Sequence, residues 1–177
     1  MNLKELVNHT RCFILRDTAL PTLWSDTEIT RYLNQAEKEF AIRTHEIVDD
    51  ETPAVVKFTT VAGQAAYDLH ASIITVNSVG IVEYDTTDSE NPVETNYTPL
   101  EDRTRRQMRR RYAKGRPCQY TTQARTQAIR LDPIPDGAYT VEMVVARKPL
   151  QPMTQGLHVP ELSEEYHMHL CDFAAYR

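Results

Sequence analysis

Apolar side chains recur at helical spacing in the first fifty residues. Between residues 3 and 17 they fall roughly along one side of a helix, at Leu3, Leu6, Val7, Phe13 and Ile14. A second stripe follows at i, i+4, i+7 and i+11, formed by Ile29, Leu33, Ala36 and Phe40. The two stripes predict a helical hairpin over residues 1–50, with two antiparallel helices and a short loop broken by Pro21.

The start of the second helix carries its own signal. Ser25 and Glu28 have the spacing of a capping box, in which the serine hydroxyl accepts from the Glu28 N–H and the glutamate reaches back. We expect the helix to run to about Ile47, and Trp24, just before the cap, to pack back on it.

The pattern changes to β-type after Pro53. Residues 53–97 are predicted to form a β-rich insertion, with a hairpin turning at Ala62-Gly63 and a strong strand over residues 73–84. An acidic loop over residues 85–96 follows this strand. Apolar and polar residues also alternate in a later β-hairpin region, residues 116–148. There the sequence predicts strands over 128–131 and 138–146, joined by a turn rich in proline, aspartate and glycine.

Two further helices complete the predicted set. Thr98 and Pro99 resemble a helix start, so a basic helix is expected over residues 98–115. Ser163 is expected to cap a C-terminal helix within residues 160–177. That helix stops at Arg177 without a stop signal, so we expect it either to fray there or to continue in further residues.

These elements predict an α+β fold in a single domain, residues 1–177. Helices from both ends of the chain would pack as a small bundle, with a β-rich insertion and one basic helix between them. Hydrophobic residues make up 41% and charged residues 25% of the chain, a balance typical of a folded protein rather than a disordered one. No run approaches the ~20 apolar residues of a membrane span, so no membrane partner is expected.

Candidate catalytic and ligand-binding motifs are scarce. Cys12, Cys118 and Cys171 are odd in number and far apart, which favours three free thiols in a reducing cytoplasm. His167 and Cys171 share a helix face, but His169 points elsewhere, and two ligands are too few for a closed zinc site. No glycine-rich phosphate loop or zinc-protease motif occurs. We therefore expect no catalytic residue, no bound cofactor and no metal.

Charge is distributed unevenly along the chain. Residues 101–116 carry eight basic and two acidic side chains, a charge of +6, while the rest of the chain carries −11. The candidate contact residues in the basic segment are Arg103, Arg105, Arg106, Arg109, Arg110, Arg111 and Lys114. The candidate acidic partners are Glu83, Asp85, Asp88, Glu90 and Glu94.

Three interpretations of this charge remain open. The arginines could be a solvated face neutralised by the acidic loop, the two segments could pair between neighbouring subunits, or the arginines could contact DNA phosphates.

Ordered short motifs resemble those of phage head-to-tail adaptor (connector) proteins. They begin with Trp24-Ser25-Asp26, Glu28-Ile29 and Tyr32-Leu33-Asn34-Gln35-Ala36. Further along the chain come Gly63 with Tyr67-Asp68-Leu69, Gly115-Arg116-Pro117 with Tyr120, Leu131-Asp132-Pro133-Ile134-Pro135-Asp136, and Pro160-Glu161-Leu162 before Tyr166-His167. The similarity spans most of the chain in the same order.

The resemblance implies a structural, non-enzymatic virion protein. It implies a homo-oligomeric ring of about twelve subunits in the neck of the virion, docked on the portal protein, with tail or nozzle proteins on its far side. DNA would pass through the lumen, with possible non-specific contact to the genome, and the protein would be made in the host cytoplasm. Two alternatives remain: a DNA-binding module centred on residues 103–116, or another neck or tail component.

Overall fold

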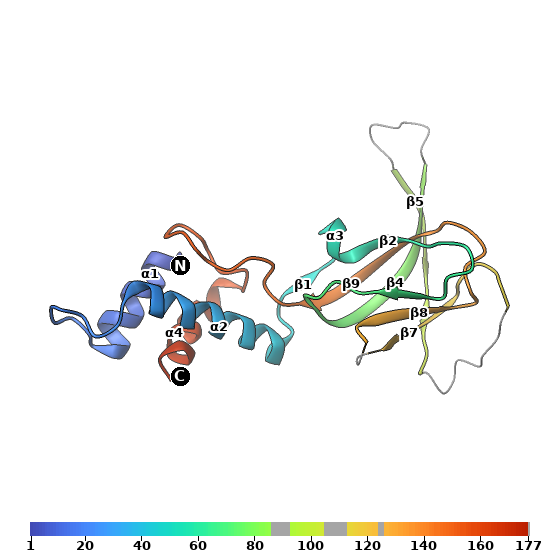
Figure 1. Cartoon of the computed structure of the whole chain (residues 1–177). Coiled ribbons are helices and arrows are strands. Elements are labelled where there is room, and N and C mark those ends of the chain that lie inside the picture. The colour runs from blue at the N-terminus through green and yellow to red at the C-terminus, as the bar shows by residue number, and fades with distance from the viewer. Residues whose placement is uncertain (86–92, 105–112, 124–125, 177) are drawn as a thin grey trace. The chain divides into compact units, whose positions relative to one another are not determined.

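The computed structural model describes residues 1–85, 93–104, 113–123 and 126–176. Its contacts divide the chain into two compact units (Figure 1). The helical unit comprises Met1–Ile47 and Arg147–Arg177, and the β unit comprises Val48–Ala146. Along the chain, helices come at both ends and the β-sheets in the middle, which confirms the predicted α+β class.

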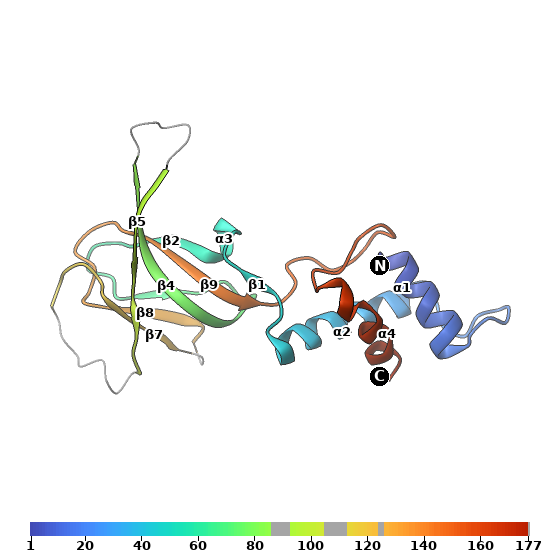
Figure 2. The same ribbon diagram turned by 180° about the vertical axis from the view of Figure 1, so that it is seen from behind.

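The helical unit contains three helices that lie side by side in two opposite views (Figures 1 and 2). They are α1 (Leu3–His9), which continues as the π-helical turn η1 (Thr10–Leu15), then α2 (Asp26–Thr44) and α4 (His167–Ala175), preceded by the 3-10 turn η2 (Glu164–Tyr166). Their apolar faces form one core around the fully buried Leu6, Leu33 and Leu170.

The local signals at α2 are confirmed. The Ser25 hydroxyl accepts the Glu28 N–H at 3.2 Å, and the Ser25 N–H donates to the Glu28 carboxylate at 2.9 Å. The Trp24 ring packs edge-on against the Tyr32 ring, with 6.2 Å between the ring centroids, so it does pack back on the helix. The helix ends at Thr44 rather than Ile47, because His45 adopts a left-handed conformation, with φ of 57°.

The predicted cap at Ser163 is wrong. Its side chain caps no helix N–H, and its hydroxyl instead lies 3.3 Å from a Glu46 carboxylate oxygen. The segment from Glu164 winds first as η2, so the α-helical part begins only at His167. A serine before two glutamates resembles a cap in sequence, but here a partner far along the chain uses its hydroxyl.

The described residues of the β unit form two sheets and one short helix, α3 (Pro53–Val56). The first sheet has the order β1-β9-β4-β5, with β2 also paired to β9, and the second has the order β3-β8-β7-β6. The strands are β1 (Val48–Asp49), β2 (Lys57–Thr59), β3 (Ala66–Asp68), β4 (Ile73–Asp85), β5 (Val93–Pro99), β6 (Glu101–Asp102), β7 (Gln119–Gln123), β8 (Ala128–Asp132) and β9 (Thr140–Arg147). Buried residues of both sheets, such as Ile81 and Ile129, form a single core between them.

Strands β4, β8 and β9 confirm the strands predicted over 73–84, 128–131 and 138–146, but the strands flanking Gly63 do not pair with each other, and neither do β8 and β9. The strands on either side of Gly63 belong to different sheets, since β2 pairs with β9 and β3 with β8. Likewise β8 and β9, on either side of the proline-rich turn, lie in different sheets. The two connections meet each other instead, where the Gly63 N–H donates to the Pro135 carbonyl at 2.8 Å. The hairpins that form are β4–β5 and β7–β8.

The predicted start of the basic helix is also wrong. Thr98 and Pro99 end β5, where they pair with Ile81 and Gly80, and β6 follows at Glu101. Proline fits the first turn of a helix because it needs no N–H partner there, and the same property suits a position in an edge strand. The acidic loop is shorter than predicted, because residues 93–96 already belong to β5. The rest of the predicted helix, residues 105–112, lies outside the described residues.

Candidate functional site

The β4–β5 hairpin, which carries the acidic candidate residues, contacts the end of the basic segment within the same chain. The Arg116 guanidinium lies 2.7 Å from the Glu83 carboxylate and donates to the Thr98 hydroxyl at 3.0 Å. Arg116 therefore connects β4 with β5, near the base of the β4–β5 hairpin. Both charged side chains are about half exposed, at 40% and 46%, so the pair lies on the surface.

The two described ends of the basic segment, residues 101–116, are hydrogen-bonded to other parts of the β unit, one to β7 and the other to the connection after β8. At one end the Arg103 N–H donates to the Tyr120 carbonyl at 2.9 Å, and its guanidinium binds the Glu101 carboxylate at 2.7 Å. At the other end the exposed Lys114 forms a β-bridge with Ile134. The remaining candidate arginines, Arg105, Arg106, Arg109, Arg110 and Arg111, lie outside the described residues.

The acidic candidates all belong to the β4–β5 hairpin or its connection. Glu83 is the one that pairs with Arg116. Asp85 ends β4 and Glu94 lies in β5, where it pairs with Tyr84 across the ladder. Asp88 and Glu90 lie outside the described residues.

A second charged cluster crosses the first sheet. The Lys57 ammonium lies 2.6 Å from the Glu142 carboxylate and donates to the Tyr84 hydroxyl at 2.9 Å, and Tyr84 in turn donates to Glu142. The bond to Glu142 raises the pKa of Lys57, and it also raises the pKa of Tyr84. Both shifts keep the proton on its own group, and the three side chains connect strands β2, β4 and β9.

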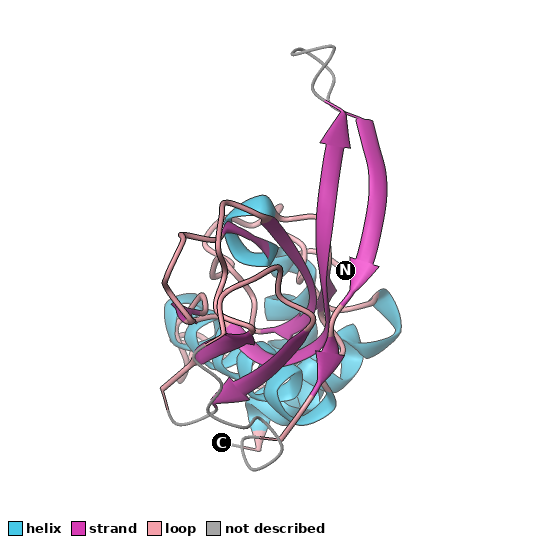
Figure 3. Ribbon diagram, turned by 90° about the vertical axis from the view of Figure 1, so that its right-hand side faces the viewer, coloured by secondary structure: helices cyan, strands magenta, loops and turns pink. Residues whose placement is uncertain are grey.

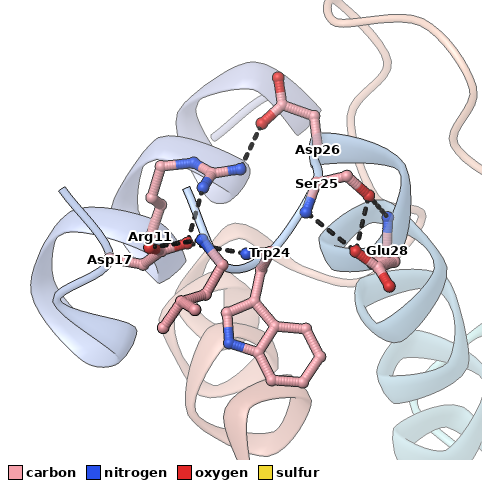
Figure 4. A network of polar contacts seen from close by, with 7 residues as sticks. Arg11, Asp17, Trp24, Ser25, Asp26 and Glu28 are labelled. Carbon is pink, nitrogen blue, oxygen red and sulfur yellow. Dashed lines mark hydrogen bonds and ion pairs between the residues drawn. The ribbon is translucent and has the colours of Figure 1, made fainter. Parts of the chain in front are cut away.

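The loop before α2 is held by a buried carboxylate (Figure 4). Asp17 accepts the N–H groups of Leu23 and Trp24, both at 2.9 Å. The Arg11 guanidinium bridges Asp17 at 3.0 Å and Asp26 at 2.7 Å. The two N–H bonds hold the pKa of the Asp17 carboxyl below its usual range. This network fixes the loop backbone while leaving Leu20 and Leu23 exposed, at 91% and 86%.

The strap, residues 148–163, runs from β9 to the last helix and is clamped to α2. Asn34 makes two bonds to Met153, accepting its N–H at 2.7 Å and donating to its carbonyl at 3.0 Å. One turn further on, the buried Glu37 accepts the Glu161 N–H at 2.7 Å. Burial raises the pKa of Glu37 to about 7, against the lowering effect of that N–H bond.

Glu161 fixes the other end of the strap. Its carboxylate binds the Arg147 guanidinium and accepts the Leu150 N–H at 2.8 Å. Together Asn34, Glu37 and Glu161 give an irregular segment the fixed hydrogen bonds that a strand would obtain from a sheet.

The last helix uses its histidine and cysteine for packing. His167 is buried and its Nε2 lies 3.0 Å from the Leu162 carbonyl, while the buried Cys171 thiol contacts the His167 carbonyl at 3.7 Å. His169 is exposed on the other side. Within the described ranges no three histidine, cysteine, aspartate or glutamate side chains gather as a metal site, and no helix is long and apolar enough to cross a membrane.

Sequence patterns assign no structural role to Asp17, Asn34 or Glu37, although Asn34 lies in one of the motifs that resemble the adaptor proteins. A usable signal exists for Glu37, which follows Leu33 by four residues and therefore lies on the apolar face of α2. A carboxylate on a buried face needs a partner, and that requirement could have pointed to the strap. No local pattern marks Asp17, because its partners are backbone groups of the following loop.

Two comparisons with known proteins complete the description of the site. The family model described as SU10 adaptor protein matches the chain over residues 1–177. Among curated proteins, no match is found.

Proposed function

This chain belongs to the SU10 adaptor protein family, and from that premise we propose that it forms a ring joining the portal of a phage head to the tail. Family membership makes it a phage structural adaptor, a component of the head-to-tail junction of the virion. In our proposal, genomic DNA passes through the lumen of the ring. The match over the whole chain carries this proposal, because it covers the helical unit and the β unit alike.

The described surfaces support a role in binding other proteins of the virion. In the β unit, the β4–β5 hairpin extends away from the two sheets (Figure 3), and Arg116 pairs with Glu83 near its base. In the helical unit, an apolar loop and a strap are fixed by buried polar side chains. Rigid exposed segments reduce the entropy lost when two proteins associate.

The direct test is to remove the protein from an infection. We expect filled heads that lack tails, and tail attachment restored when the protein is supplied in trans. In electron micrographs of complete particles, a label fused to the protein should lie at the neck. A label on the tail tip or baseplate would instead favour a different tail component.

For the charged segments we propose pairing between neighbouring copies. Arg103, Arg105, Arg106, Arg109, Arg110, Arg111 and Lys114 of one copy would face the acidic hairpin residues Glu83, Asp85, Asp88, Glu90 and Glu94 of the next. The Arg116–Glu83 pair supports this proposal, because it brings the two segments together on one surface. Complementary charge of this kind selects partners and fixes their register.

Charge reversal tests this pairing. Arg106→Glu with Arg110→Glu should abolish ring assembly but leave the monomer folded, and adding Asp85→Lys with Asp88→Lys should partly restore it. If the arginines instead contact DNA, the Glu variant should assemble normally and retain or pass DNA abnormally. Full, infectious particles from the Glu variant would contradict both interpretations.

We also propose that the protein alone is a weakly associating monomer that forms its ring on the portal. The apolar stripes of its helices are buried in the core of the chain, so only small surfaces remain for contacts between copies. Such contacts are weak singly and become strong when many form at once in a ring. Native mass measurement, with and without portal, tests this. A stable ring at low micromolar concentration without a partner would contradict it.

A further inference from the structure

The helical unit exposes two separate apolar projections. The first is the apolar loop, residues 18–24, where Leu20 and Leu23 are 91% and 86% exposed. The second is the strap patch, formed by Leu157 and Val159 in the strap, which are 82% and 60% exposed. Isolated exposed leucines are common on proteins, but these lie in pairs on uncharged segments.

Both projections are held in fixed positions. Asp17 binds the N–H groups of Leu23 and Trp24, as described above. The strap patch is bound to the start of α1, where the Leu3 N–H donates to the His158 carbonyl at 2.7 Å and the Lys4 N–H donates to Gly156 at 3.0 Å. A chain that fixes apolar side chains in water gives up their hydrophobic stabilisation unless a partner covers them.

The two projections lie at opposite ends of one helical segment. The strap patch adjoins Leu3 and Lys4 at the beginning of α1, and the apolar loop comes shortly after Leu15, the last residue of η1. That segment, Leu3–Leu15, spans roughly 20 Å at the usual ~1.5 Å rise per residue. Two different patches at separate places on one unit are what a head-to-tail contact requires, whereas a twofold dimer needs only one.

We propose that the apolar loop of one copy packs on the strap patch of the next, so that the helical unit supplies the contact that propagates the ring. This inference rests on the proposed ring for its biological setting, but the contact itself can be measured without it. Residues 18–25 and 149–160 contain no aspartate, glutamate, lysine or arginine, so bringing them together buries no unpaired charge. With only a few side chains on each side, the contact is far smaller than the ~1,200 Å² of a stable pair, as a template-dependent ring requires.

Cross-linking between single-cysteine chains tests the contact. In a background with the exposed Cys12 and Cys118 replaced by serine, one chain carries Leu20→Cys and a second, tagged chain carries Leu157→Cys. A short bis-maleimide reagent is added to the mixture and the products are separated by mass. We expect the mixed product at least tenfold above either self-product. Val61→Cys, 58% exposed in the β unit, is the matched control and should give only the background yield with each partner.

Leu23→Asp in the Leu20→Cys chain should remove the mixed product, and Val159→Asp in the Leu157→Cys chain should do the same. Unchanged melting curves of all variants show that they remain folded.

Several outcomes would overturn the proposal. A mixed yield no higher than the Val61→Cys control would do so, as would a Leu20→Cys self-product equal to the mixed one, which indicates a twofold contact. In complete particles, capture of another virion protein by Leu20→Cys in place of a second copy would reassign the loop. If the mixed product fails but labelled protein lies at the neck, this inference fails and the proposed function stands. A mixed product without neck labelling means the reverse.

Discussion

The two units hold their irregular segments by different means. In the helical unit, side chains bind the backbone of distant segments, with Asp17 on the apolar loop and Asn34 and Glu37 on the strap. In the β unit the Thr60 hydroxyl makes a similar link to Gly137 and Tyr139, but most of the backbone is paired in two sheets, and close packing adds to this where the Tyr97 ring covers Gly80. The difference predicts that polar substitutions act strongly in the helical unit, whereas steric ones act strongly in the β unit.

The largest effect is expected at Glu37. Its pKa is raised from 4.5 to about 7, so between these values the folded state keeps a proton that the unfolded state has released. The free energy of unfolding therefore falls as pH rises through this window, and Glu37→Gln removes that loss. The variant should be more stable than the parent by on the order of 3 kcal/mol at pH 8, and about equally stable near pH 4.5, measured by urea unfolding at each pH.

Glu164→Gln is the control for Glu37, because its side chain is 88% exposed in the same unit. It should leave the pH profile as it is in the parent. A Glu37→Gln profile that follows the parent would mean that the Glu37 carboxylate does not hold the extra proton.

In the β unit, Gly80→Ala should destabilise by about 1–2 kcal/mol. A Cβ at Gly80 overlaps the ring of Tyr97 on the neighbouring strand, so the ring must leave its place. Adding Tyr97→Ser should remove most of the penalty in thermal unfolding. Gly137→Ala, with nothing within 4 Å of its Cβ, should change stability little. Equal effects at both glycines would argue against tight packing of the hairpin.

Ser25→Ala should cost ~1 kcal/mol by removing the cap of α2. Assembly surfaces should be unaffected, because the substitution acts on helix stability alone. Circular dichroism during heating measures the loss. An unchanged melting temperature would show that the cap contributes nothing to the helical unit.

The smallest effect is expected for the exposed Arg116–Glu83 pair. A double-mutant cycle with Arg116→Gln and Glu83→Gln should give a coupling of about 0.5 kcal/mol that shrinks further at high salt. A coupling of several kcal/mol would make this surface pair as important as the buried carboxylates of the helical unit, and would remove the contrast between the two units.

Sequence patterns worked best where their physical cause is local. The capping box at Ser25 and the stripe that follows it correctly set the start and buried face of α2, since both depend on residues three and four positions apart. The same reasoning failed at Ser163 and at Thr98-Pro99, where distant partners take the groups that a helix start would use. Among the site residues, the acidic and basic segments were found by charge, and Arg116–Glu83 joins them in the structure.

What the sequence alone determined is that helices lie at both ends of the chain and strands in the middle, where α2 starts, and that basic residues are separated from acidic ones. Periodicity and charge are properties of neighbouring residues, and they survive in any tertiary arrangement. Only the tertiary structure decided that β8 pairs with β7 rather than β9, and that Asn34 and Glu37 bind the strap more than a hundred residues away. Strands with alternating apolar and polar residues can pair with many other strands, and the sequence does not show which acceptor a backbone N–H will bind. The packing of the whole chain therefore decides which strands pair and which groups form hydrogen bonds.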